Sequence, residues 1–333
     1  MKLRFTSLFS GCGGFDLGFV NAGFSCIAAF DLDKDAIAAY KRNIGPHIQQ
    51  ADLSKPGSNV LQAATAADVL IAGPPCQGFS TAGKNDPDDA RNSLLLNVAN
   101  IAAIARPRIV VIENVRGLLS PQYETHRKTL LTILANAGYQ VASRVIDGTE
   151  LGVPQHRRRV IVVATLGPRP IDLVFPSSPK ITLRDALAGV ESKKQHMVRL
   201  LSPDSQTFQI ARHILPGQKL SNVRGGEPSV HTWHIPEVFG ETTDQEKAVL
   251  ECILSVRRKI RRRLNGDADP VSARAIFRVL NFPVAKTLTE LIKKGYVRKL
   301  DGYYDLTNAF NGKFRRLRWD DSAPTVDTRF GQP

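Results

Sequence analysis

Two kinds of segment alternate along residues 1–165: short, almost wholly apolar runs, and longer stretches in which apolar residues recur with helical spacing. Apolar runs that are separated by helices indicate the strands of a mostly parallel sheet with helices on both faces. The runs interpreted as strands are Arg4–Phe9, Ser25–Phe30, Val69–Ala72, Ile109–Glu113, Gln140–Ile146 and Arg159–Ala164. The stretches interpreted as helices are Phe15–Ala22, Lys34–Asn43, Leu94–Ala105 and His126–Ala137. The predicted fold class is α/β with a doubly wound, mostly parallel sheet, and ligands are expected beyond the carboxyl ends of its strands.

The chain is basic, and its positive charge is concentrated in the second half. Of its 333 residues, 45 are Lys or Arg and 31 are Asp or Glu, which gives a formal net charge of +14. Residues 1–165 carry 17 basic and 13 acidic side chains, whereas residues 166–333 carry 28 and 18. This balance favours a polyanionic partner such as a nucleic acid.

A proline-rich segment, Gly167–Pro179, indicates a boundary between two regions. We expect one domain over residues 1–168 and a second region over residues 169–318. Residues 245–307 of the second region predict three helices, followed by a hairpin with Asp301-Gly302 at its turn. The three helices are Gln245–Leu264, Val271–Leu280 and Val284–Lys294. This order is typical of a winged helix, whose second and third helices form a helix-turn-helix. The alternative is a helical insertion with an accessory hairpin.

Several classes of protein are excluded or disfavoured by the sequence. No apolar run approaches the 18 or so residues that span a bilayer, so we expect no membrane association. The four cysteines form no Cys-x-x-Cys pair, which favours a reducing, cytoplasmic environment. His231 and His234 have a spacing that metal ligands use, but no Cys lies near them in the sequence. We therefore predict no metal site.

A glycine-rich turn follows the first expected strand, with the sequence Phe9-Ser10-Gly11-Cys12-Gly13-Gly14-Phe15. Glycines at this place permit a tight turn and close approach of a ligand to the backbone. Asp31 ends the second strand, where a carboxylate can bind both hydroxyls of a ribose. Asp16 occupies the position of the third glycine in the dinucleotide fingerprint, which favours a cofactor with a single nucleoside. The alternative is a turn without a ligand.

Three other strand ends carry reactive side chains. Cys76 follows Pro74-Pro75 in a polar loop, where its thiolate would be a soft nucleophile, although single cysteines are more often buried and inert. Glu113 ends the fourth strand, and Arg157 and Arg159 precede or begin the last strand of this region. Strand alternation would place Arg157 and Arg159 on one face, where they could bind an anion or a carbonyl oxygen. For Glu113, Arg157 and Arg159 the alternative is a solvated surface position.

Four segments, taken in order, resemble the signature motifs of the DNA cytosine-5 methyltransferases. They are Phe9-Ser10-Gly11-Cys12-Gly13-Gly14, Gly73-Pro74-Pro75-Cys76-Gln77, Glu113-Asn114-Val115 and Gln155-His156-Arg157-Arg158-Arg159. The resemblance runs over about residues 3–165 and implies S-adenosylmethionine as the cofactor. It places Phe9, Gly11 and Gly13 around the methionine end of the cofactor, Asp31 on its ribose and Asp52 on its adenine. Pro75 and Leu94 match further positions that line the cofactor.

The resemblance also implies a mechanism. Cys76 would add to C6 of a cytosine, which makes C5 nucleophilic, while Glu113 hydrogen-bonds N3 and the exocyclic amine. Arg157 and Arg159 match the family's paired arginines, and Arg159 would hold the cytosine O2. The base must first leave the stacked duplex. Residues 77–92 resemble the loop that closes over it, and Gln77, Ser80 and Gln155 are candidate DNA contacts.

The second region would then recognise double-stranded DNA, with Lys286, Arg298 and Lys299 as candidate contacts. Family members continue beyond this region with two further motifs, and residues 319–333 resemble only the approach to the first of them. We therefore expect either a shortened chain or a second subunit that supplies the remainder. A prokaryotic restriction-modification role in the cytoplasm, associated with the nucleoid, is a family expectation. The alternatives are an RNA cytosine-5 methyltransferase acting on tRNA, and a DNA-binding subunit that is inactive without its partner.

Overall fold

The computed structural model describes residues 2–75, 93–168, 171–190, 192, 200–222, 228–261, 268–309 and 314–326. The chain divides into two units, Met1–Lys180 and Ile181–Pro333. The division lies at the end of the proline-rich segment.

The N-terminal unit is built on a seven-stranded sheet of order β3-β2-β1-β4-β5-β8-β6. Neighbouring strands from β3 to β5 pair in parallel, and only β8 runs antiparallel to its neighbours β5 and β6. The strands are β1 (Arg4–Leu8), β2 (Ser25–Asp31), β3 (Ile48–Gln50), β4 (Val69–Ala72), β5 (Ile109–Val115), β6 (Tyr139–Asp147) and β8 (Arg158–Leu166). The predicted doubly wound, mostly parallel α/β sheet is confirmed. The short edge strand β3 was not predicted.

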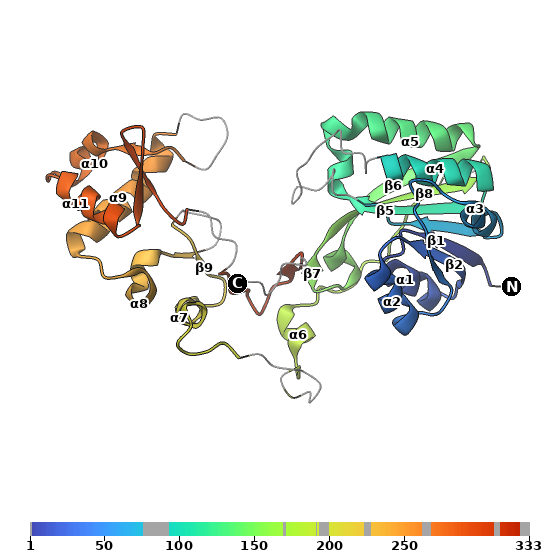
Figure 1. Ribbon diagram of the computed structural model, residues 1–333, viewed down its shortest axis with the longest axis horizontal. Helices are drawn as coiled ribbons and strands as arrows, with labels where there is room; N and C mark the ends of the chain where they lie inside the picture. The colour runs from blue at the N-terminus through green and yellow to red at the C-terminus, as the bar shows by residue number, and fades with distance from the viewer. Residues whose placement is uncertain are drawn as a thin grey trace. The chain divides into compact units, whose positions relative to one another are not determined.

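Helices cover both faces of this sheet (Figure 1). They are α1 (Gly14–Asn21) and α2 (Lys34–Asn43) on one face, and α3 (Ser58–Thr65), α4 (Ser93–Ala105) and α5 (Glu124–Asn136) on the other. Strand β4 shows why its sequence is continuously apolar. Val69 and Ile71 pack with the phenylalanines of α1, whereas Leu70 and Ala72 pack in the core formed with α3, α4 and α5. Burial on both faces leaves no position for a polar side chain.

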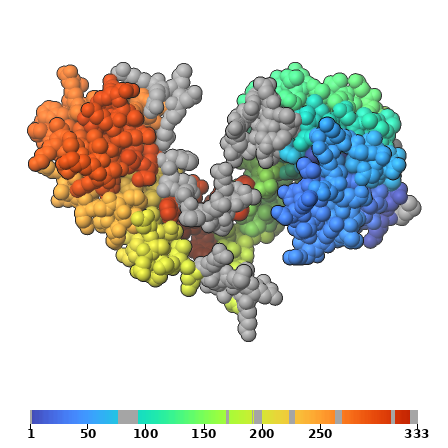
Figure 2. Space-filling model, in the orientation of Figure 1, coloured from blue at the N-terminus to red at the C-terminus, as the bar shows by residue number. Residues whose placement is uncertain are grey.

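Residues 244–261 and 268–306 of the C-terminal unit form a helical body, drawn in orange and red in Figure 2. Its elements, in chain order, are α9 (Asp244–Lys259), β11 (Val271–Ser272), α10 (Ala273–Leu280), α11 (Ala285–Lys293), β12 (Val297–Leu300) and β13 (Tyr303–Leu306). The strands form an antiparallel sheet of order β11-β13-β12. Asp301 and Gly302 both have positive φ, 47° and 82°, which suits a tight hairpin turn. The elements thus follow the order expected of a winged helix.

Short elements make up the rest of the described chain. They are β7 (Gln155–His156), α6 (Leu183–Leu187), α7 (Gln206–Arg212), β9 (Lys219–Leu220), β10 (Ser229–Val230), α8 (Pro236–Phe239), β14 (Ala323–Pro324) and the 3₁₀ turns Arg116–Leu119, Pro121–Tyr123, Gly148–Leu151 and Thr232–His234. Among the described residues, no helix has the length and apolar character needed to cross a membrane.

Candidate active site

The glycine-rich turn joins β1 to α1 at the carboxyl edge of the sheet. Phe9, Gly11 and Gly13 all have positive φ, at 55°, 54° and 89°. A Cβ added to Gly13 would lie 2.6 Å from Ile44 Cγ1 and 2.8 Å from Tyr40 Cδ2, so packing excludes any side chain there. A Cβ added to Gly11 would meet no described atom within 4 Å. The backbone at Gly11 therefore borders open space, as a ligand-binding turn requires.

Asp31, at the end of β2, is bound to this turn. Its Oδ2 accepts a hydrogen bond of 2.7 Å from the Gly11 amide, and its Oδ1 accepts one of 2.9 Å from the Asp33 amide. A carboxylate oxygen has a second lone pair, so both oxygens can still accept a hydrogen bond from a ribose hydroxyl. The glycine turn and Asp31, the candidate residue for binding the ribose, are thus joined directly by a hydrogen bond.

The other predicted cofactor residues follow neighbouring strands or begin a helix. Asp52 comes after β3, and its Oδ1 accepts a hydrogen bond of 2.8 Å from the Ser54 amide. Hydrogen bonding to Ser54 lowers the pKa of Asp52, so this exposed carboxylate is ionised at neutral pH. Pro75 follows β4, and Leu94 lies half-buried in the first turn of α4. All of them lie where a doubly wound sheet binds ligands.

Glu113 and Arg159 form an ion pair across the neighbouring strands β5 and β8. The distance from Arg159 Nε to Glu113 Oε1 is 2.6 Å, and their side chains are 21% and 31% exposed. The strands pair antiparallel with Val115 opposite Arg159 and Glu113 opposite Ile161. The ion pair orients the carboxylate at the sheet edge.

The segment that leads to Cys76 lies beside both the glycine turn and Glu113. A Cβ added to Gly73 would be 3.7 Å from the Phe9 carbonyl oxygen and 3.9 Å from Glu113 Oε2. The buried Asn114 side chain donates a hydrogen bond of 3.5 Å to the Pro74 carbonyl. The carboxyl ends of β1, β4 and β5 therefore converge at Gly73-Pro74-Pro75. Cys76 and the candidate DNA contacts Gln77 and Ser80 lie outside the described residues.

The arginines of the fourth motif have separate environments. Arg158, next to Arg159 on β8, places Nε 3.1 Å from Asp147 Oδ2. Although burial opposes it, hydrogen bonds from Thr149 and Arg158 hold the pKa of Asp147 below its ordinary value. Arg157 lies between β7 and β8 and belongs to neither strand. The predicted alternation that would place Arg157 and Arg159 on one face therefore does not extend to Arg157. Gln155 opens β7, and its amide donates to the Val153 carbonyl at 2.7 Å.

Sequence reasoning missed a buried polar cluster beneath the glycine turn. Asp16 in the first turn of α1 is 0% exposed, and it accepts hydrogen bonds of 2.8 Å from both Tyr40 Oη and Ser7 Oγ. Burial raises the pKa of Asp16, and these two hydrogen bonds oppose that effect. The one available signal was an acidic residue at a position where the dinucleotide fingerprint has glycine.

The candidate DNA contacts of the C-terminal unit differ in their partners. Lys286 and Lys299 are exposed, on α11 and β12. Arg298 binds Asp305, which faces it on β13, at 2.9 Å. Asp305 is also bound, at 3.1 Å, by the buried Arg257 of α9. Arg298 is therefore tied to the hairpin, whereas both lysines extend into solvent.

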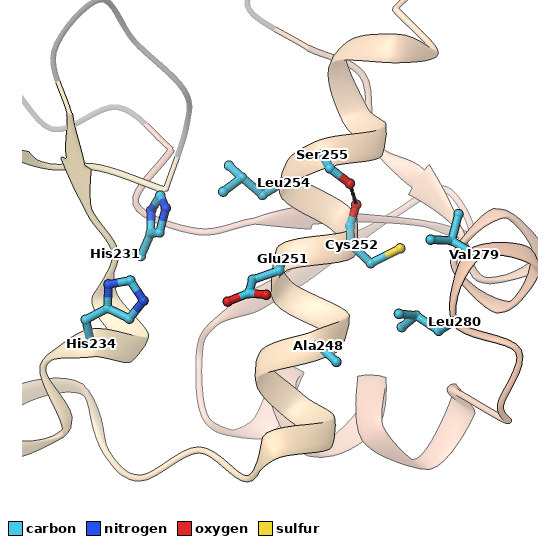
Figure 3. Close-up of a pocket in the computed structure, with 9 residues that line it drawn as sticks. All are labelled: His231, His234, Ala248, Glu251, Cys252, Leu254, Ser255, Val279 and Leu280. Carbon is cyan, nitrogen blue, oxygen red and sulfur yellow. Dashed lines mark hydrogen bonds between the residues drawn. The ribbon is translucent and has the colours of Figure 1, made fainter.

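The C-terminal unit has a cavity of about 560 Å³ that is lined by His231, His234 and Glu251 of α9. The two histidines face the Glu251 side chain across it (Figure 3). His231 Nδ1 lies 2.8 Å from the Ser221 carbonyl, and burial lowers the pKa of both histidines. Within the described residues, no group of three or more His, Cys, Asp or Glu side chains is placed to hold a metal ion.

Comparisons with known proteins relate the chain to one protein family. A family model described as C-5 cytosine-specific DNA methylase matches residues 3–267. The type II methyltransferase M.HgiBI of Herpetosiphon aurantiacus is 30% identical over 326 residues, which cover 92% of this chain and 72% of the relative. M.NgoBV of Neisseria gonorrhoeae is 30% identical over 276 residues, covering 78% and 62%. In fold, the chain is similar to a prophage-encoded E. coli protein assigned as a DNA modification methyltransferase, with a TM-score of 0.54, 20% identity and coverage of 98% and 82%.

Proposed function

Because the chain belongs to the C-5 cytosine-specific DNA methylase family, we propose that it methylates C5 of cytosine in double-stranded DNA through a covalent bond between Cys76 and C6 of a flipped-out base. The family is one of DNA methyltransferases, and M.HgiBI and M.NgoBV are type II methyltransferases. We assign this chain to the same kind of restriction-modification system, which would place it on the DNA of a bacterial cytoplasm.

The single observation that carries this proposal is the convergence at Gly73. The position of an added Cβ there is within 4 Å of both the Phe9 carbonyl oxygen, in the glycine turn, and Glu113 Oε2. Cys76 follows Gly73 by three residues. We infer that Cys76 would meet the acid and the cofactor turn at this edge of the sheet, as methyl transfer to a base requires.

The residues at this edge fit S-adenosylmethionine, which supplies the methyl group when bound. The open backbone at Gly11 would lie against the methionine end, together with Phe9 and Gly13. Asp31 would accept hydrogen bonds from the ribose hydroxyls and Asp52 from the adenine amine. Pro75 and Leu94 would line the same cofactor site. The fixed hydrogen bond between Gly11 and Asp31 supports this assignment, because it sets the distance between two contacts to one ligand.

The chemistry assigned to the polypeptide begins with the Cys76 thiolate. Its sulfur would bond to C6 of cytosine, which moves electron density to C5. Glu113 would hydrogen-bond N3 of the cytosine and supply or share the proton that stabilises this addition. Arg159 would hold O2 as negative charge develops there. Arg157 is a second candidate for that anion contact. Loss of the C5 proton after methylation would then release the thiol. The ion pair of 2.6 Å supports the pairing of Glu113 and Arg159 in this step.

The C-terminal unit would bind the DNA target. Lys286 and Lys299 offer exposed ammonium groups to phosphate, and their helix and hairpin are the parts of a winged helix that face DNA. Arg298 is the third candidate, held by Asp305. Gln77, Ser80 and Gln155 are the proposed contacts from the N-terminal unit. The charge of the second half supports a substrate rich in phosphate.

Transfer of a tritiated methyl group from S-adenosylmethionine to duplex DNA and to tRNA, in parallel, tests the proposal. We expect label in DNA, recovered as 5-methylcytosine after hydrolysis, and none in tRNA. Label in tRNA alone would replace DNA by RNA as the substrate. Label in neither, with a chain that still binds duplex DNA, would favour a binding subunit over an enzyme.

A further inference from the structure

Beneath the glycine turn, four oxygen-bearing side chains form a buried network centred on Asp16. Ser10 Oγ donates to Ser7 Oγ at 2.9 Å, and Ser7 Oγ donates in turn to Asp16 Oδ2 at 2.8 Å. Tyr40 Oη donates to Asp16 Oδ1 from the other side, also at 2.8 Å. Both carboxylate oxygens of Asp16 thus accept a hydrogen bond from a hydroxyl.

Tyr40 carries this network outward to two further groups. Its hydroxyl lies 2.9 Å from His47 Nε2 and 3.7 Å from Cys26 Sγ. The single hydroxyl proton goes to Asp16, so His47 must present Nε2–H to the tyrosine oxygen. Burial raises the pKa of Cys26 to about 12, which keeps this thiol neutral. Asp16 is the member of this network that accepts hydrogen bonds from both sides.

The network touches the glycine turn at two points. The ring of Tyr40 lies against Gly13, where an added Cβ would come within 2.8 Å of Cδ2. Ser10 is the second point, because its amide donates to the Phe30 carbonyl at 3.1 Å and its hydroxyl accepts from the Phe30 amide at 3.2 Å. Gly11 follows Ser10 and Asp31 follows Phe30. The Gly11 amide donates to Asp31, which joins the turn to the end of β2 a second time.

A buried carboxylate is costly unless it is fully hydrogen-bonded, and a hydrophobic residue would fill the same space without that cost. A satisfied buried polar network specifies one arrangement of the segments that it joins. Here the segments joined are the glycine turn, the end of β2 and α2.

We propose that Asp16 and Tyr40 are positioning residues for the cofactor, which hold Gly11 and Asp31 at the spacing that its nucleoside and methionine ends require. The inference rests on the proposed function, since it names residues that act through the assigned cofactor site. Asp16 and Tyr40 are both fully buried. They act through Ser7, Ser10 and Gly13.

Substitution Tyr40→Phe is the direct test, because it keeps the ring against Gly13 and removes only the hydroxyl. Tyr139→Phe is the matched control. Tyr139 is also buried, and its hydroxyl donates to the Pro107 carbonyl at 2.7 Å, away from the glycine turn. Calorimetric titration with S-adenosylmethionine and steady-state methylation would be run on the wild type and both variants.

For Tyr40→Phe we expect a rise of about tenfold in the Kd and KM for the cofactor, with kcat within about twofold of the wild type. For Tyr139→Phe we expect a similar loss of thermal stability but an unchanged Kd. Equal cofactor affinity in the two variants would overturn the inference. A wild type that does not bind S-adenosylmethionine would instead overturn the proposed function.

Ser7→Ala approaches Asp16 from the opposite side and tests whether the network acts as a unit. We expect it to weaken cofactor binding as well, and the double variant with Tyr40→Phe to lose less than the product of the two single effects. Strictly multiplicative effects on Kd would overturn joint action through Asp16. If Tyr40→Phe does not fold, the affinity of Ser7→Ala relative to Tyr139→Phe decides the inference.

Discussion

Arg159 Nε and Glu113 Oε1 lie 2.6 Å apart, across two antiparallel strands of an otherwise parallel sheet. The antiparallel strand β8 is what brings them together, because its beginning adjoins the end of β5. A parallel strand at this position would begin at the opposite edge of the sheet. The single reversed strand therefore supplies an arginine to the edge where parallel strands present an acid.

Glu113→Gln tests the role of the acid. The amide keeps the size of the side chain but cannot share a proton with N3 of cytosine. We expect methyl transfer to fall about 1,000-fold, with unchanged affinity for S-adenosylmethionine. The measurement is tritiated methyl transfer to duplex DNA, with Glu150→Gln as the exposed control. A Glu113→Gln variant with near wild-type activity would remove Glu113 from the mechanism.

Arg159→Lys tests the guanidinium. Lysine keeps the positive charge but loses the planar group that can hold both Glu113 and a carbonyl oxygen. We expect kcat to fall about 100-fold. Arg158→Lys is the matched control, since Arg158 is the next residue and binds Asp147 instead. Equal losses in the two variants would indicate a structural effect on β8 and not a role in the reaction.

The sequence predicted the central part of this site better than its edges. Strand β4 was predicted with its observed ends because it is apolar on both faces, and the Glu113 and Arg159 strands were found for the same reason. Strand β3 was missed because only Ile48 of its three residues is buried, which leaves no pattern to detect. The Asp16 cluster was missed because its members come from distant segments. Nothing in the local sequence of Tyr40 indicates that its hydroxyl reaches α1.

The three candidate DNA contacts of the C-terminal unit, Lys286, Arg298 and Lys299, should fall into two classes. Lys286→Ala and Lys299→Ala should each weaken DNA binding at all sequences and reduce the slope of log affinity against log salt by about 1. Arg298→Ala should in addition lower the free energy of unfolding, by up to about 1 kcal/mol, since Arg298 is 56% exposed and its partner Asp305 keeps Arg257. Fluorescence anisotropy over a salt series and urea unfolding separate the two classes. Lys293→Ala, whose lysine pairs with Glu290, is the control. A salt slope unchanged by either lysine variant would contradict the assignment.

Stability should decrease as the pH falls below the ordinary pKa of histidine, in part because of His47. Burial lowers the pKa of His47 in the folded chain, and the charge of Asp16 opposes this only partly. The unfolded chain therefore binds this proton first, so the contribution to stability is present above pH 6.5 and is lost as the pH falls below it.

His47→Gln should reduce this loss. The measurement is the Tm of the wild type and of the variant between about pH 7.5 and pH 5. His231 and His234 also have lowered pKa values and remain in both proteins, so the difference between the two curves isolates His47. Parallel curves would show that His47 does not titrate in this range.

The central claim is that Cys76 bonds to a flipped-out cytosine, and trapping on duplex DNA that contains 5-fluorocytosine tests it most directly. Fluorine at C5 blocks the proton loss that releases the thiol, so the bond between Sγ and C6 persists. We predict a denaturation-resistant complex of chain and DNA that requires S-adenosylmethionine, is lost in Cys76→Ser and is retained in Cys252→Ser, which alters a free cysteine of the C-terminal unit. A complex that survives Cys76→Ser, or no complex with a chain that methylates the unmodified duplex, would contradict the account.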